Sequence, residues 1–171
     1  MESIFKNEQI ALDDLPRYET LVFTSVSTKH LTKSLLNMGI WLVVLAIGLS
    51  VWFLYNPQDV VLYIAAAVLL FFGFQCFLIF KKQACYGYAL RERDIAFKRG
   101  YIFRKTTVIP FNRIQHVSTA QGVLDKLLHI VTLQIFTAGG SGSDINIPGL
   151  QPERAAAIKE ALVQKVDDAQ E

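Results

Sequence analysis

Few residues in this chain have the types and spacing that enzyme chemistry requires. The three histidines, His30, His116 and His129, fall in different predicted elements, and the sequence has no HExxH motif or His/Cys ligand spacing. Ser141 has no GxSxG context, and the carboxylates lie mainly on predicted turns or on the last predicted helix. We therefore predict no metal site, no cofactor and no enzymatic activity.

The glycine-rich loop at residues 139–142 does not have the features of a phosphate-binding loop. It lacks the Lys-Ser/Thr pair that contacts phosphate, and it leads into a predicted strand rather than a helix, so a turn is the better interpretation. Cys76 and Cys85 form neither a CxxC pair nor a ligand cluster with histidine. This usage argues against a disulfide framework and fits a reducing compartment.

Two long apolar segments must position whatever site the chain has. Residues 35–55 and 60–80 carry no charge. As helices, each would span roughly 30 Å, the thickness of a bilayer hydrocarbon core. In a soluble protein of this size, helices that are apolar all round have nothing large enough to pack against. We therefore predict a two-helix transmembrane hairpin over residues 34–81, with a tight polar turn at residues 56–59.

Positive charges flank the apolar segments on one side. Lys29 and Lys33 precede the first segment, Lys81 and Lys82 directly follow the second, and the turn between them has no Lys or Arg. The positive-inside rule then places both termini in the cytoplasm. We predict a multi-pass protein of the plasma (inner) membrane. Because neither apolar segment contains an ionisable residue, the hairpin alone is a poor candidate for a transporter.

One segment near the predicted membrane exit is rich in cations. It contains seven of them against only Glu92 and Asp94. The seven are Arg91, Arg93, Lys98, Arg99, Arg104, Lys105 and Arg113. They are candidate contacts for an anionic lipid or a partner, at about 1 kcal/mol for each residue near an anionic surface. The alternative is that they form the solvated side of two hairpins. The net charge of +2 is too small to indicate nucleic-acid binding.

The rest of the chain divides by composition. Residues 1–33 form an N-terminal cytoplasmic segment, in which Tyr18–Thr28 is a short strand or an interfacial segment. Residues 84–166 form a second domain, and residues 167–171 a tail. The domain contains six alternating segments and a short helical turn at residues 123–128. The six predicted strands are residues 86–90, 95–97, 103–109, 113–117, 131–135 and 144–147.

An amphipathic helix that begins at Pro152 ends the domain. Its apolar face consists of Ala155, Ile158, Leu162 and Val166. We predict an α+β domain in which this helix covers a curled antiparallel sheet.

Four segments resemble the bacterial pleckstrin-homology-like (PH-like) domain. They are Tyr88-Ala-Leu-Arg-Glu-Arg-Asp-Ile, Lys98-Arg-Gly-Tyr-Ile-Phe-Arg-Lys-Thr-Thr, Ile109-Pro-Phe-Asn-Arg-Ile-Gln-His-Val117 and Leu124-Asp-Lys-Leu-Leu-His129, the last with histidine where the family commonly has glycine. The two preceding apolar segments resemble the membrane-anchored, YdbS-like branch of that family. The resemblance implies a split β-barrel, capped by a helix, that is used for binding or assembly. It does not imply phosphoinositide specificity.

We expect a non-enzymatic, membrane-anchored PH-like scaffold or assembly module within a larger membrane complex. One alternative is a module that senses anionic lipid at the cytoplasmic leaflet. Another is an accessory subunit of a transport or resistance system, which would need partner helices for a polar pathway. The expected partners are the membrane and either a second copy of this chain or another membrane protein, such as a second PH-like protein. We expect no binding of nucleic acid.

Overall fold

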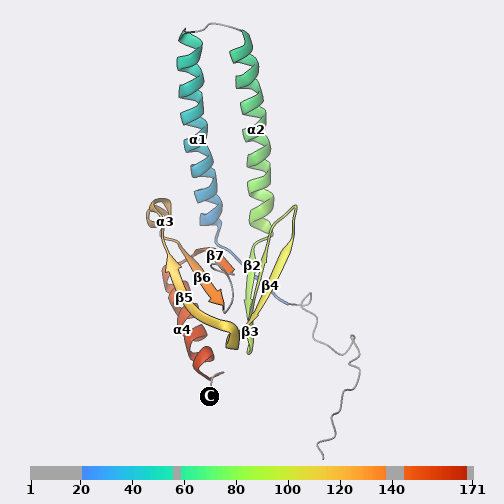
Figure 1. The fold of residues 1–171 in the computed structure, drawn as a ribbon, viewed down its shortest axis with the longest axis vertical. Coiled ribbons are helices and arrows are strands. Elements are labelled where there is room, and N and C mark those ends of the chain that lie inside the picture. The colour runs from blue at the N-terminus through green and yellow to red at the C-terminus, as the bar shows by residue number, and fades with distance from the viewer. Residues whose placement is uncertain (1–20, 56–58, 138–144, 169–171) are drawn as a thin grey trace, which may run out of the picture.

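A computed structural model describes residues 21–55, 59–137 and 145–168 of the chain. Two long helices stand side by side on one end of a small β-rich domain (Figure 1). They are α1 (Thr28–Tyr55) and α2 (Asp59–Ala84). Most of the predicted turn at 56–59, the glycine-rich loop at 139–142 and the first twenty residues lie outside the described structure.

Both helices include the predicted apolar segments and extend past them at the domain end. Ser27 caps α1, because its Oγ accepts a hydrogen bond of 3.3 Å from the Lys29 N–H. The apolar side chains of the two helices stay largely uncovered by the described protein. No α1 residue is buried, and only Val61 and Leu78 are buried in α2. Helices of this length and composition are candidate membrane spans.

The β-rich domain consists of two antiparallel sheets. The first has the strand order β1 (Thr24–Ser25), β2 (Gly87–Leu90), β3 (Asp94–Arg99) and β4 (Lys105–Pro110). The second has the order β5 (Ile114–Ala120), β6 (Val131–Thr137) and β7 (Ile145–Leu150). A 3-10 helix, η3 (Phe111–Arg113), joins the sheets. All six predicted strands are therefore present, and β1 comes from the N-terminal segment that the sequence left open.

The last helix, α4 (Pro152–Asp168), closes the core as predicted. Its predicted apolar face packs onto the second sheet, with Ala155 and Leu162 at most 1% exposed. The strands contribute alternating aliphatic and aromatic side chains, among them the fully buried Ile95, Leu133 and Ile147. Each such side chain stabilises the fold by about 1.5–3 kcal/mol relative to an exposed one. The domain thus has the predicted α+β architecture.

The predicted helical turn forms α3 (Val123–Leu128), which ends at a left-handed residue. His129 has φ = 51°, and its N–H bonds back to the Lys126 carbonyl over 3.3 Å. Glycine adopts this conformation without a Cβ clash, whereas other residues adopt it at a cost of about 1–2 kcal/mol. His129, which stands where the family commonly has glycine, therefore lies at a position whose backbone conformation favours glycine.

Replacing this histidine is expected to stabilise α3. His129→Gly should raise the local stability by about 0.5–1 kcal/mol, because the relief of strain exceeds the added freedom of the unfolded chain. Hydrogen exchange of residues 122–130 should become slower by a few-fold. His116→Gly is the matched control, since His116 lies in β5 and stacks on Phe136 with ring centroids 4.1 Å apart. Equal effects of both substitutions would contradict this account of His129.

Candidate functional site

The junction between the long helices and the domain is held by side chains from both. Gln83, in the last turn of α2, donates hydrogen bonds from Nε2 to the carbonyls of Val26 (3.2 Å) and Ser27 (3.0 Å). These two residues directly precede α1. One amide therefore ties the domain end of α2 to the domain end of α1.

An ion pair fixes α3 against α1. The Lys33 Nζ lies 2.7 Å from Oδ1 and 2.8 Å from Oδ2 of Asp125, and Asp125 is only 4% exposed. The Lys33 ammonium donates a hydrogen bond to Oδ2, and the Gly122 N–H donates a second hydrogen bond of 3.0 Å to the same oxygen. Burial alone would raise the pKa of Asp125, but the Lys33 and Gly122 hydrogen bonds and the Lys33 charge lower it below its usual value. The carboxylate is therefore ionised at neutral pH.

The backbone of β7 approaches α1 closely at Gly149. This glycine has φ = 68°, and a Cβ placed on it would lie 2.6 Å from the His30 Cβ and 3.1 Å from Cγ1 of Val26. The His30 ring packs edge-on to Tyr86, with centroids 5.6 Å apart. Only a residue without a side chain allows this approach. Contacts from α1, α2, α3 and β7 thus hold the domain in one orientation relative to the helices.

The structure separates the predicted cationic segment into two groups. We call the end of the domain from which α1 and α2 leave the helix-side end, and the opposite end the far end. The turn between β2 and β3 lies at the far end, and the turn between β3 and β4 lies at the helix-side end (Figure 1). Arg91, Arg93 and Arg113 belong to the far end, and Lys98, Arg99, Arg104 and Lys105 to the helix-side end.

The two groups differ in their contacts. Arg91 forms an ion pair with Asp94 that closes the β2–β3 turn, which is a structural role. Lys98 lies 5.7 Å from the centre of the Phe23 ring. Arg104 and Lys105 are exposed. Arg93 and Arg113 at the far end are exposed as well, but of the predicted contact residues only those at the helix-side end lie where a ligand beside the helices can reach them.

The four lysines predicted to flank the spans also lie at the helix-side end. Lys29 and Lys82 are exposed, and the Lys81 Nζ lies 5.5 Å from the centre of the Phe77 ring one turn earlier in α2. Lys33 is different, because Asp125 neutralises it. We did not predict this pairing, because the two residues are 92 positions apart in the chain.

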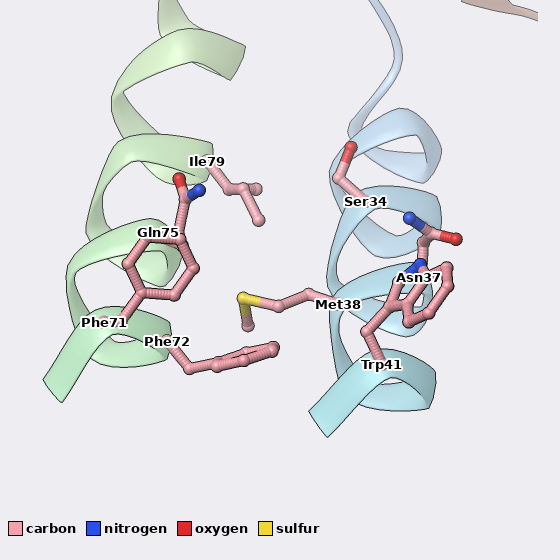
Figure 2. A pocket seen from close by; sticks show the side chains of 8 residues that line it. All are labelled: Ser34, Asn37, Met38, Trp41, Phe71, Phe72, Gln75 and Ile79. Carbon is pink, nitrogen blue, oxygen red and sulfur yellow. The ribbon is translucent and has the colours of Figure 1, made fainter. Parts of the chain in front are cut away.

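A cleft of about 390 Å³ beside α1 and α2 is lined by the two amide side chains of the apolar segments, Asn37 and Gln75. Met38 and Phe72 point into the gap between the helices (Figure 2). The amides of Asn37 and Gln75 come from different helices and do not meet (Figure 2). Within the described residues neither amide has a hydrogen-bond partner. An amide left unpaired in hydrocarbon is costly, so these two groups favour association with a further polar group.

Strand β4 is an edge of the first sheet and bonds only to β3 among the described strands. The Phe111 N–H donates to the Arg93 carbonyl over 3.1 Å. In an antiparallel ladder, alternate pairs exchange both hydrogen bonds. The register pairs Ile109 with Ile95 and Thr107 with Phe97, so these residues also bond inward to β3.

The β4 residues that alternate with Thr107 and Ile109 must then direct their backbone groups outward, away from β3. Among the described residues nothing pairs with the outward N–H and carbonyl of Thr106 and Val108, whereas Pro110 presents a carbonyl alone. Val108 is 40% exposed, so the edge is accessible. Such a row of unpaired backbone groups is a template for pairing with another strand.

These features define a PH-like domain joined to apolar membrane helices, and comparisons with known proteins agree. The family model described as "Bacterial PH domain" matches residues 30–166, a range that runs from α1 into α4. This chain belongs to the bacterial PH domain family, in its transmembrane form. No solved structure matches it significantly.

Two transmembrane proteins of Bacillus subtilis (strain 168) are similar to this chain. YdbS is 28% identical over 122 residues, which cover 71% of this chain and 75% of YdbS. YdbT is 30% identical over 81 residues, which cover 47% of this chain and only 16% of YdbT. The likeness to YdbS therefore covers most of both proteins, whereas that to YdbT covers one part of a much longer chain.

Proposed function

We propose that this protein is a membrane-anchored, non-enzymatic scaffold, whose PH-like domain recruits another membrane protein by strand addition to β4. The observation that carries the proposal is the outward-facing backbone of Thr106 and Val108 at an accessible sheet edge. An extended segment of the partner would pair with these groups and add a strand to the first sheet. The rigid junction would keep this edge at a constant position beside the membrane.

The partner is a membrane protein rather than a soluble one. Asn37 and Gln75 support this choice, because their unpaired amides in the apolar helices would find hydrogen-bond partners on a neighbouring helix. The partner would then contact the two helices in the membrane and strand β4 outside it at the same time. Either contact would raise the effective concentration of the partner at the other site.

The protein is proposed to cross the plasma (inner) membrane twice, with both termini and the PH-like domain in the cytoplasm. The helix-side lysines support this topology, because Lys29, Lys81 and Lys82 lie where the two helices leave the domain.

Blocking the β4 edge should abolish recruitment without unfolding the domain. Thr106→Pro/Val108→Pro removes two outward N–H groups and no bond to β3, at a cost of about 1–3 kcal/mol of binding, or roughly fivefold to 150-fold in affinity. A photo-crosslinking amino acid placed in the edge at Lys105 should capture one membrane partner in native membranes, and the two prolines should remove that product.

The control for this prediction keeps the backbone groups. Thr106→Val/Val108→Thr changes the same side chains but retains both N–H groups, so it should crosslink like the unsubstituted edge. If the proline variant gives the same product at the same yield, strand addition at β4 is excluded.

A further inference from the structure

Two exposed apolar projections stand at the helix-side end of the domain. One is the β3–β4 turn at residues 100–104, where Ile102 is 61% and Phe103 is 89% exposed. The other is α3, where Val123 is 86% and Leu127 is 71% exposed. We call these the two apolar tips. Side chains of this size rarely stay in water to this extent unless the surface binds something.

Both tips are fixed in position relative to the long helices. The β3–β4 turn is tight, because Gly100 has φ = 88° and a Cβ there would collide with the Phe103 carbonyl. Its strand β3 pairs Lys98 with Gly87, only three residues after α2 ends at Ala84. The second tip is held to α1 by the Lys33–Asp125 ion pair. Figure 1 shows α3 and the β3–β4 turn on opposite sides of the helix pair, both level with the helix bases.

Cations surround the apolar tips. Arg99, Arg104 and Lys105 flank the β3–β4 turn, and Lys126 lies on α3 between its two exposed apolar residues. An apolar tip inside a group of cations has the polarity of the boundary between lipid headgroups and acyl chains. The cations match the negative charge of anionic headgroups.

We propose that the two apolar tips insert into the bilayer that surrounds α1 and α2, and that the flanking cations bind anionic headgroups there. The domain then contacts the membrane at three places: the helix pair and one tip on either side of it. The occupant is lipid rather than protein, because the helices bring the bilayer to the level of both tips in every molecule. This inference does not rest on strand addition at β4, which would use the backbone groups of Thr106 and Val108 in the strand that follows the turn.

The test measures the lipid contact of each tip in the full-length chain. In a Cys76→Ala/Cys85→Ala background, a fluorescent label is attached to one new cysteine at a time. Phe103→Cys and Leu127→Cys probe the tips, and Leu90→Cys and Val163→Cys are controls elsewhere in the domain at exposed apolar positions. The purified protein is reconstituted in vesicles of phosphatidylglycerol and phosphatidylcholine that contain lipids with a quencher in the upper acyl chain.

Labels at 103 and 127 should lose most of their fluorescence, while those at 90 and 163 keep it. Adding Arg104→Gln/Lys105→Gln should reduce the quenching at 103 to the level seen in phosphatidylcholine alone. Quenching at neither tip, or at one tip only, would overturn the two-point insertion. Labels that become shielded only when a membrane extract supplies other proteins would assign the tips to a protein partner instead. Equal quenching with and without phosphatidylglycerol would overturn the binding of anionic headgroups.

Discussion

Gly149→Ala is expected to lower the free energy of unfolding of the junction by about 2–5 kcal/mol, the sum of left-handed strain and overpacking. The new Cβ would lie 2.6 Å from the His30 Cβ, an atom that cannot rotate away because it is bonded to the helix backbone. Either β7 or α1 must move. The result would be a domain that is folded but poorly held beneath the helices, or one that fails to assemble.

Thermal unfolding in mild detergent and hydrogen exchange at residues 26–33 and 145–150 would measure this effect. Gly39→Ala and Gly48→Ala are matched controls, because a Cβ at either helical glycine meets nothing within 4 Å in the described structure. Both should leave stability unchanged or raise it slightly. His30→Gly should recover part of the loss in the Gly149→Ala background, since it removes the colliding Cβ. An unchanged junction in Gly149→Ala alone would contradict the close approach of β7 to α1.

Asp125→Asn is expected to have the second largest effect. It removes the negative charge that faces Lys33 and weakens the cap on Gly122, at a cost of about 1.5–3 kcal/mol. Hydrogen exchange in α3 should increase most, with a smaller increase in the first turns of α1. Glu160→Gln, an exposed carboxylate on α4, should have little effect. If Lys33→Met/Asp125→Asn costs as much as the two single changes together, the two side chains do not act as a pair.

The same pair predicts how the junction responds to acid. The folded pKa of Asp125 is lower than its unfolded value of about 3.9. Its contribution to stability is therefore complete above the unfolded value and is lost as the pH falls through the lower, folded value. The protection of α3 amides, taken relative to the intrinsic exchange rate at each pH, should fall between about pH 4 and the folded pKa in the wild type, and should not change over that range in Asp125→Asn.

The sequence predicted the elements of this fold better than their contacts. The two apolar segments, the short helix at residues 123–128 and the buried face of α4 all follow from local periodicity, which is a property of nearby residues. The junction does not. The Lys33–Asp125 pair joins residues 92 positions apart, and Lys33 in isolation has the sequence context of a flanking cation. Asp125 in isolation does not indicate a distant cation either, because its sequence neighbour Lys126 is itself a cation.

The cationic segment shows a second limit. Its residues are close in sequence, but a hairpin sends neighbouring turns to opposite ends of a sheet. Arg91 and Arg104 are therefore at different ends of the domain, although both were candidates for one surface. The apolar tip at the β3–β4 turn was missed because Phe103 was expected to be the first residue of a strand. In the structure β4 begins only at Lys105, which leaves Ile102 and Phe103 exposed in the turn.

The measurement that tests the proposed scaffold most directly is purification of the tagged full-length protein from its native membrane in mild detergent. Mass spectrometry and native sizing would be applied to the wild type, to Thr106→Pro/Val108→Pro and to Thr106→Val/Val108→Thr. We expect one stoichiometric membrane partner to elute with the wild type and with the Val/Thr variant, and to be lost from the proline variant. Elution of the wild type alone, or equal retention of the partner by all three, would contradict it.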